Sequence, residues 1–257
     1  MLRLSQGHLN MLETCPRKFQ HLYLDRLGSP NDPKLQESGE WGNRFHLMMQ
    51  QQELGLPIEG LLQEDQALKE AIAALKIAAP HLFVAQPGTF REAEHGRSLM
   101  VADAWLTVVY DLLIATPQSA QIIDWKTYPQ PKQRKRIAQN WQTRLYLYVL
   151  AQTSDYEPEQ LSMTYWFVRL PKEPESLTLT YNRQKHEQTH RDLTHLLSQL
   201  NQYLGQYWDD KLPFPQVPTT QQSLCDRCDF AALCQRPESQ VETDWSSRLA
   251  QISEISL

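Results

Sequence analysis

Four cysteines constrain the folding of this chain most, because they stand near its two ends. Cys15 is alone in the N-terminal part, whereas Cys225, Cys228 and Cys234 form a Cys-x-x-Cys-x5-Cys group in the C-terminal part. Thiolates at such spacing bind zinc or iron–sulfur clusters. If all four bind one metal group, more than 200 intervening residues form a closed loop, and the two ends of the chain must meet. Free or disulfide-bonded thiols are the alternative.

The composition indicates an ordinary globular protein outside membranes. Of the 257 residues, 41% are hydrophobic, which is enough for the core of one large domain. No apolar stretch approaches the roughly 18 residues of a membrane span, and the start of the chain is polar too early for a signal peptide. We therefore expect a cytoplasmic protein without a membrane partner. Stable disulfides are rare in that compartment, which favours metal binding by the cysteines.

The pattern of apolar and turn residues predicts an α/β fold with a central mixed sheet between helices. We expect a single domain over residues 1–237 and an acidic, flexible tail over 238–257. The strand at 121–125, the following helix and the strand at 161–170 resemble a βαβ crossover. The expected helices are 5–24, broken at Pro16, then 37–53, 62–79, 136–153 and 183–208. The expected strands are 90–95 and 99–114, with a turn at Gly96-Arg97, then 121–125, 161–170 and 176–181.

Asp124 and Lys126 lie two residues apart on a short apolar strand. Side chains two residues apart share one face of a strand, so both point the same way and Trp125 points into the core. Asp111 ends an apolar run, where a buried carboxylate is costly unless it is paired or bound to metal. Hard oxygen ligands of this kind hold Mg²⁺ or Mn²⁺. A structural Asp–Lys pair at the strand end is the alternative, as is pairing of Asp111 with an arginine.

The residues from Trp125 to Arg144 carry six basic side chains and no acidic one. Phosphate binding requires such local positive charge, although the net charge of −5 counts mildly against a nucleic-acid binder. A solvated loop and helix start is the alternative. The six are Lys126, Lys132, Arg134, Lys135, Arg136 and Arg144.

Four motifs in order resemble the PD-(D/E)XK superfamily in its RecB-like branch, over roughly residues 5–235. They are Gly42-Asn-Arg-Phe-His46, Tyr110-Asp111, Ile122-Ile-Asp124-Trp-Lys126-Thr127 and Gln142-Thr-Arg-Leu-Tyr146. The resemblance implies a restriction-endonuclease-like core and an Mg²⁺- or Mn²⁺-dependent DNA nuclease.

The same resemblance implies a role for each motif residue. His46, Asp111, Asp124 and the Trp125 carbonyl would bind the metal, and Lys126 would orient or deprotonate the attacking water. Gln142 and Tyr146 share one helix face and would support the site and contact DNA. We add Arg136 and Arg144, from the basic segment, as substrate contacts.

The cysteine layout also matches the branch that carries an iron–sulfur cluster. It implies a [4Fe–4S] cluster on Cys15, Cys225, Cys228 and Cys234, with zinc as the alternative. Because it closes a very long loop, such a cluster would be structural.

The sequence departs from the family pattern at Val108, where a glycine often stands three residues before the first aspartate. Asp103 is therefore a second candidate in place of Asp111. Glu92 and Glu94, on the preceding strand, could add an acidic group, but a surface position is the simpler interpretation.

The resemblance extends to CRISPR-associated RecB-like exonucleases and to the nuclease domain of AddAB-type enzymes. It implies an exonuclease on single-stranded DNA. Because the chain contains no Walker A motif, it has no helicase motor of its own, and it would act alone or with a helicase, CRISPR or repair protein as its partner. One alternative is a catalytically weak DNA-binding or assembly subunit of a repair or CRISPR complex. Another is a zinc protein in which the Asp-x-Lys is incidental.

Overall fold

The computed structural model describes residues 2–28, 33–63, 65–128, 134–168, 173–226 and 228–236, with the backbone alone over 33–38. The expected tail at 238–257 lies outside these residues, as does Lys132.

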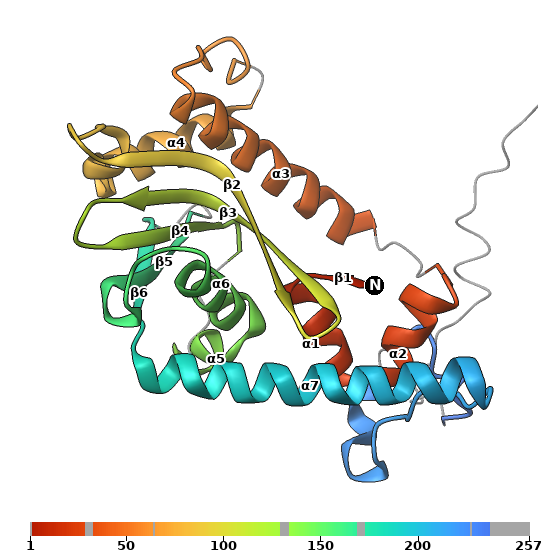
Figure 1. Cartoon of the computed structure of the whole chain (residues 1–257). Coiled ribbons are helices and arrows are strands. Elements are labelled where there is room, and N and C mark those ends of the chain that lie inside the picture. The colour runs from red at the N-terminus through yellow and green to blue at the C-terminus, as the bar shows by residue number, and fades with distance from the viewer. Residues whose placement is uncertain are drawn as a thin grey trace, which may run out of the picture.

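A six-stranded mixed sheet forms the centre of the molecule (Figure 1). The strands run in the order β1-β3-β4-β5-β6, and β2 pairs with β3 on its other side. β4 and β5 are parallel, which confirms the βαβ crossover, whereas β2–β3, β3–β4 and β5–β6 are antiparallel. The strands are β1 Leu2–Leu4, β2 Phe90–Val101, β3 Ala104–Ala115, β4 Ala120–Lys126, β5 Leu161–Phe167 and β6 Glu175–Thr180.

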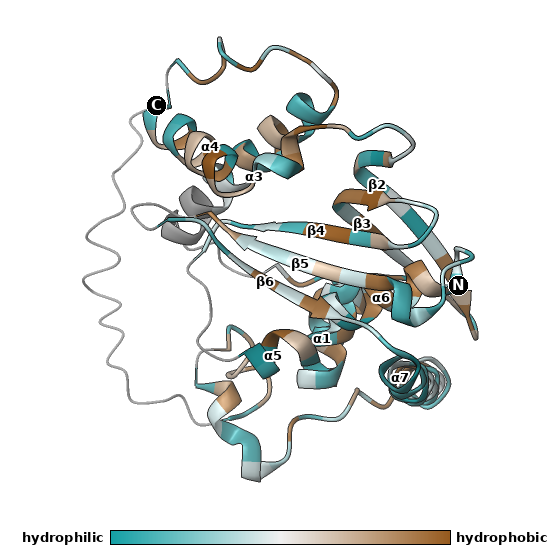
Figure 2. Cartoon of the chain, turned by 90° about the vertical axis from the view of Figure 1, so that its left-hand side faces the viewer, coloured by the Kyte–Doolittle hydropathy of each residue, from teal (hydrophilic) through white to brown (hydrophobic). Residues whose placement is uncertain are grey.

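Helices cover both faces of the sheet (Figure 2), so the expected α/β fold with a mixed sheet is confirmed. α3 (Pro33–Glu53) and α4 (Gln66–Ala78) lie on one face, whereas α1 (Gln6–Thr14), α5 (Arg134–Gln139), α6 (Trp141–Gln152) and α7 (Arg183–Asp209) lie on the other. Two core clusters result. None of the helices in the described part of the chain combines the length and apolarity that a membrane crossing needs. The short elements are α2 (Pro16–Phe19), a π-helical turn η1 (Gln20–Leu24) and 3₁₀ turns η2 (Pro80–Phe83), η3 (Pro158–Gln160) and η4 (Thr219–Cys225).

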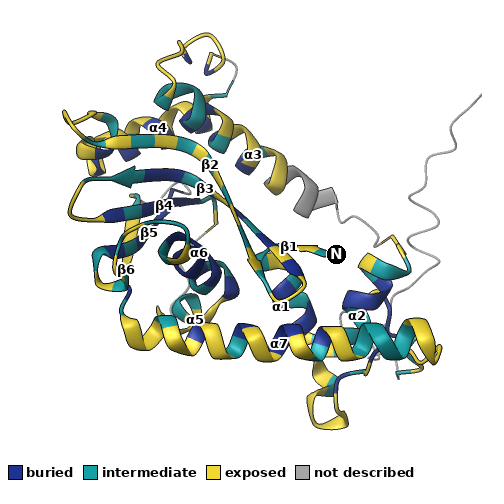
Figure 3. Cartoon of the chain, in the orientation of Figure 1, coloured by how far each residue is buried: buried dark blue, intermediate teal, exposed yellow. Residues whose placement is uncertain are grey.

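The helix boundaries follow from local chemistry. Pro16 stands at the first position of α2, so the expected break in the N-terminal helix is confirmed. The single helix expected over 136–153 is wrong, because the chain breaks at Asn140. Asn140 has extended backbone angles, and its side chain accepts a hydrogen bond from the Gln142 N–H, which caps α6. α6 is almost entirely buried, whereas α7 exposes one face to solvent (Figure 3).

The turn expected at Gly96-Arg97 is also wrong. β2 continues to Val101, and the chain reverses at Ala102-Asp103, where Ala102 has a φ of 51°. Gly96 lies in mid-strand opposite Val109. The long β2–β3 hairpin that results extends beyond β4, and β1 pairs with its outer end at Ala104–Leu106 (Figure 1).

The alternation of side chains between the two faces of the sheet shifts by one residue in β3 at Asp111. Tyr110 packs in the cluster beneath α6, whereas Leu112 packs in the cluster beneath α3 and α4. Regular alternation would place these two side chains on one face. Opposite this point in β2, Glu94 has a φ of 52°, and the pairing passes from Ala93 opposite Leu112 to His95 opposite Tyr110. Irregular strand geometry of this kind re-aims side chains and often borders functional sites.

The two ends of the described chain pack together. The Arg17 N–H donates to the Pro215 carbonyl at 3.0 Å, and the Phe214 N–H donates to Gln20 Oε1 at 2.7 Å. The Phe19 and Phe214 rings stack with centroids 6.2 Å apart. The segment after α7 is therefore fixed against α2, although these residues are about 200 positions apart in sequence.

Candidate active site

One open cleft of about 570 Å³ collects the residues of all four motifs. α3 contributes His46, β3 contributes Asp111, and β4 contributes Asp124 and Lys126. α6 contributes Gln142 and Tyr146 to the same cleft. The structure thus brings together side chains that are as much as 100 residues apart.

His46, Glu94 and Asp111 form a compact group at this cleft. Their ligand atoms lie within 4.8 Å of one another, and His46 Nδ1 is 3.4 Å from Asp111 Oδ2. No other set of three or more metal-ligating side chains in the described residues is as close. One nitrogen and two carboxylates suit a divalent cation such as Mn²⁺ or Mg²⁺. Glu94 is exposed, as the sequence favoured, and it is also a member of this group.

Asp124 lies outside this group and is held by two polar neighbours. Gln142 Nε2 donates to Asp124 Oδ1 at 2.6 Å, and Lys126 Nζ lies 2.6 Å from Asp124 Oδ2. Lys126 Nζ also donates to Gln142 Oε1 at 2.8 Å, which closes a triangle. Asp124 is 2% exposed, and its Oδ2 atom makes no well-aligned hydrogen bond within the described residues. That buried oxygen is the atom that a cation could use.

Trp125 joins the cleft to the core behind it. Its backbone N–H donates to Asp111 Oδ2 at 2.7 Å, which fixes the orientation of that carboxylate. The indole is buried, as expected, and contacts Phe45 edge-on at 6.5 Å between centroids. The orientation of Asp111 therefore depends on the packing of β4 against α3.

Burial and repulsion between carboxylates dominate the electrostatics of the cleft. Burial raises the pKa of Asp124, as does the charge of Asp111, and the neighbouring Lys126 only partly opposes this. Burial and Asp111 likewise raise the pKa of Glu94. For His46, burial lowers the pKa, but Asp111 and the other carboxylates raise it more, so that it ends above its ordinary value. The site therefore carries an excess of negative charge that a bound cation would neutralise.

Gly42 allows α3 to approach the end of β4. A Cβ atom at this position would lie 2.9 Å from Thr127 Oγ1, closer than real Cβ contacts. Since His46 lies one helical turn further along α3, this close approach brings the imidazole to the carboxylates of the cleft. The spacing of the Gly-x-x-x-His motif thus has a packing reason.

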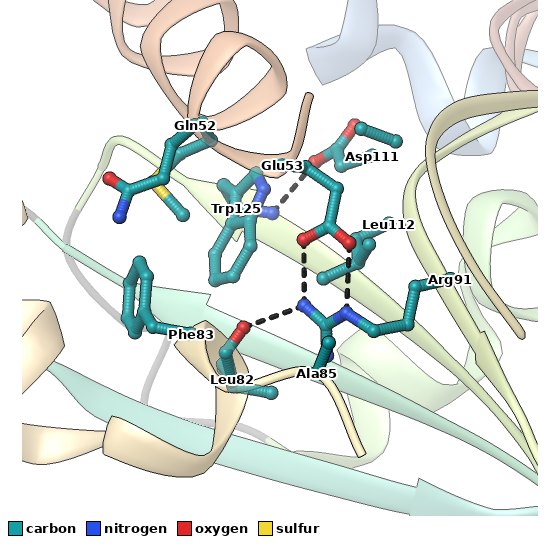
Figure 4. Close-up of a pocket in the computed structure, with 11 residues that line it drawn as sticks. Gln52, Glu53, Leu82, Phe83, Ala85, Arg91, Asp111, Leu112 and Trp125 are labelled. Atoms are coloured by element: carbon teal, nitrogen blue, oxygen red, sulfur yellow. Dashed lines mark hydrogen bonds and ion pairs between the residues drawn. The ribbon is translucent and has the colours of Figure 1, made fainter. Parts of the chain in front are cut away.

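A second cavity, of about 130 Å³, lies on the other side of Asp111 and Trp125 (Figure 4). Arg91 donates to both carboxylate oxygens of Glu53 at 2.8 and 2.7 Å and to the Leu82 carbonyl at 2.7 Å. The two side chains are 9% and 19% exposed. This buried pair ties the end of α3, which carries His46, to the start of β2, which carries Glu94.

Several sequence candidates lie elsewhere. Arg144 pairs with Asp192 on α7 and stacks over the Trp141 ring, so it faces away from the cleft. Arg136 is exposed on α5 and does not line the cleft. Asp103 lies exposed in the hairpin turn, and Glu92 pairs with His95 at 2.6 Å.

The four cysteines gather where the two ends of the chain meet. Cys15 caps α2, and its Sγ accepts a hydrogen bond from the Lys18 N–H at 3.4 Å. Burial raises the pKa of Cys225, and Cys228 and Cys15 raise it further. Burial also raises the pKa of Cys234, and the three other cysteines raise it further. All four side chains are partly exposed and free.

Comparison with solved structures supports the fold. A candidate exonuclease from Eubacterium rectale aligns with a TM-score of 0.58 at 10% identity, over 97% of this chain and 94% of that chain. SSO0001 aligns with a TM-score of 0.42 at 13% identity, over 90% of this chain and 85% of that chain, a likeness too weak to carry an argument. Among curated protein sequences, none matches. Residues 3–235 match the family model of the PD-(D/E)XK nuclease superfamily, and because this match spans nearly the whole described chain, the protein belongs to that superfamily.

Proposed function

We propose that this protein is a Mg²⁺- or Mn²⁺-dependent deoxyribonuclease of the RecB-like branch, acting as an exonuclease on single-stranded DNA. Members of the superfamily use divalent metals, and a nuclease would bind DNA. The observation that carries the proposal is the group of His46, Glu94 and Asp111 beside the Asp124–Lys126 pair. A metal-assisted hydrolytic site needs a cation next to groups that position the attacking water.

His46, Glu94 and Asp111 would hold the cation. The donor set fits, because it combines an imidazole with two carboxylates whose charges are not balanced in the site. Asp124 and the Trp125 carbonyl would complete the set, once the buried Asp124 Oδ2 turns from Lys126. When bound, the cation would lower the pKa of a coordinated water and offset the charge of the phosphate.

Lys126 would orient the attacking water and stabilise negative charge on the phosphate. Its pKa lies above the ordinary value, because Asp124 outweighs the effect of burial, so the amine stays protonated in this state. Proton abstraction by Lys126 would thus require release from Asp124. Gln142 would hold the side chains of Lys126 and Asp124 in place through its two hydrogen bonds. Tyr146, on the same face of α6, would border the substrate strand in the cleft.

The wider assignments are part of the same proposal. We propose a cytoplasmic location. We also propose a helicase, CRISPR or repair protein as a separate partner, because the chain lacks a helicase motor motif. A catalytically weak DNA-binding subunit is the second candidate. The observation that favours it is the position of Asp124, whose carboxylate is engaged by Lys126 and Gln142 and lies outside the compact group.

The test is cleavage of end-labelled single- and double-stranded DNA by anaerobically prepared protein with Mg²⁺, Mn²⁺ or chelator. We expect metal-dependent shortening of single strands from an end. Lys126→Ala should abolish it, and Lys185→Ala, on the distant helix α7, should not. Absence of cleavage by the wild type with every metal and DNA end, together with retained DNA binding, would establish the subunit alternative.

We also propose a structural [4Fe–4S] cluster on Cys15, Cys225, Cys228 and Cys234, with zinc as the alternative. The thiols of Cys225 and Cys234 interact electrostatically with other cysteines of the set. The layout of the four cysteines along the chain, which resembles that of the iron–sulfur branch, favours the cluster over zinc. Brown protein with broad visible absorption, lost in Cys15→Ser, is expected; colourless protein with one zinc per chain would contradict it.

A further inference from the structure

The outer half of the β2–β3 hairpin presents a solvent-exposed sheet face that leads away from the cleft. Val109 lines the cleft and is 41% exposed. Trp105, four residues earlier on the same strand, is 37% exposed, and Met100 opposite it is 44% exposed. Exposed apolar side chains in a row are uncommon on a protein surface without a binding role.

The strand register places these side chains on one face. Alternate residues of a strand point the same way, so Trp105, Thr107 and Val109 share the face that Asp111 ends. Residues opposite one another share a face as well, which adds Met100 beside Trp105 and Ser98 beside Thr107. The residues between them, such as Leu106 and Val108, are buried in the cluster beneath α6. The exposed face is therefore distinct from the core face.

A basic residue stands at the far end of this face. β1 pairs with the start of β3 in parallel, and Arg3 lies opposite Trp105. Arg3 is exposed and has no ion-pair partner in the part of the chain that the structure describes. Arg3, Trp105 and Met100 thus form one row across three strands. We call this row, together with Ser98, Thr107 and Val109, the hairpin track.

The combination of an aromatic ring, a cation and uncharged neighbours suits one class of ligand. Proteins that bind single-stranded nucleic acid stack bases on exposed aromatic rings and contact the backbone with basic side chains. A protein partner is less well matched, since the small polar residues Ser98 and Thr107 lie between the apolar residues of the track. Duplex bases could not reach the indole, because they are stacked and paired.

We propose that the hairpin track binds the single strand of the substrate beyond the scissile phosphate, with one base stacked on Trp105 and a phosphate on Arg3. This rests on the proposed nuclease function and names the part of the molecule that selects single strands. Trp105 lies six residues from Asp111, about 20 Å along an extended strand, so a substrate must span several nucleotides to reach it. The track therefore acts on long substrates and not on short ones.

The test compares cleavage of a thymidine oligomer of about 12 nucleotides with that of a thymidine dinucleotide in Mn²⁺. Trp105→Ala should raise KM for the oligomer about 10-fold and leave kcat unchanged, because stacking is lost and the reacting groups are untouched. Dinucleotide cleavage, which reports the active site alone, should not change. Trp105→Phe should restore most of the affinity. The matched control is Trp208→Ala, another exposed tryptophan, on α7.

Arg3→Ala provides a second variant in case Trp105→Ala destabilises the sheet. Arg3→Ala should reduce the slope of log affinity for the oligomer against log salt concentration by the amount expected for about one phosphate contact. Arg3→Lys should restore the wild-type slope. An unchanged KM for the oligomer in both Trp105→Ala and Arg3→Ala would overturn the proposal. So would a concentration-dependent dimer of the wild type that Trp105→Ala abolishes, since the face would then bind a second copy. Absence of cleavage of both the oligomer and the dinucleotide by the wild type would instead contradict the nuclease function.

Discussion

Two aspartates show how differently the cleft and the cysteine end are built. In the cleft, burial and the charge of Asp111 raise the pKa of Asp124. At the cysteine end, burial also raises the pKa of Asp25, but hydrogen bonds from Tyr207, His21 and Gln20 more than offset it, so this pKa falls below its ordinary value. Tyr207, at the end of α7, donates to Asp25 Oδ1 at 2.7 Å. The cleft holds carboxylates that lack enough partners, whereas the cysteine end satisfies them.

This difference indicates a division of labour. Groups at the cleft oppose folding and are retained for their chemistry, whereas contacts at the cysteine end stabilise the fold. Substitutions in the two regions should therefore separate activity from stability. The variants below follow in order of expected effect.

Asp111→Asn should have the largest effect on activity. The amide can still accept the hydrogen bond from the Trp125 N–H, but it removes a charged ligand. Loss of about 4 kcal/mol of charge stabilisation corresponds to a cleavage rate on the order of 1,000-fold lower. The thermal midpoint should stay equal or rise, because repulsion with Asp124 disappears. A strongly lowered midpoint would place Asp111 among the stabilising residues and break the comparison.

Cys15→Ser should have the opposite profile. Loss of a link that closes so long a loop should lower the free energy of unfolding by about 3 kcal/mol or more. The serine can still cap α2, so the local helix start is preserved. Denaturant unfolding of anaerobic protein measures the stability, and DNA cleavage is then normalised to folded molecules. Unchanged stability would mean that the cysteines do not link the two ends of the chain.

Arg91→Met should destabilise the region behind the cleft. It leaves Glu53 buried without its bidentate partner, which costs about 3 kcal/mol. The control is Arg183→Met, which breaks an exposed pair with Glu157 at 70% and 66% exposure and should cost less than about 1 kcal/mol. Chemical unfolding of both variants decides the matter. Equal losses would show that the pair behind the cleft is no more buried in solution than a surface pair.

Gly42→Ala should push α3 away from β4. The added methyl meets Thr127 Oγ1 at 2.9 Å, and overpacking of this kind costs about 1 to 3 kcal/mol. We expect weaker activation by Mn²⁺, because His46 moves with the helix, and recovery in the double variant with Thr127→Ala. Gly39→Ala, which meets no atom within 4 Å, should instead stabilise the helix by about 1 kcal/mol.

Asp25→Asn should have the smallest effect, and one that depends on pH. Because the pKa of Asp25 is depressed in the folded state, its contribution is present above the unfolded pKa of about 3.9 and is lost as pH falls through the lower folded pKa. The thermal midpoint of Asp25→Asn should lie below that of wild type at neutral pH and converge with it in strong acid. Asp103→Asn, in the exposed turn, should match wild type throughout. A difference that persists in strong acid would show that the carboxylate charge is not the stabilising factor.

Much of the cleft could be predicted from sequence because its residues belong to local motifs. Asp124 and Lys126 share a strand face by spacing alone, and Gln142 and Tyr146 share a helix face. That these residues lie near His46 could be predicted only from the order of the motifs. Glu94 was only a secondary candidate, together with Glu92, because the hairpin turn was assigned to Gly96-Arg97. With the turn at Ala102-Asp103, strand register places Glu94 opposite Asp111, so the error in one turn concealed which of the two belongs to the metal group.

The sequence by itself determined the α/β class, the positions of most elements, the motif residues and the expectation that the two ends meet. The class and the elements follow from periodicity and capping, which act over a few residues, whereas the motif residues and the meeting of the ends follow from the resemblance to the nuclease family. Only the tertiary structure decided that Glu94 joins His46 and Asp111, that Arg144 turns to Asp192, and that Asp124 is held by Lys126 and Gln142. These outcomes depend on register, on packing across the sheet and on competition between partners for one charge. Such long-range terms are not encoded in any short segment of the chain.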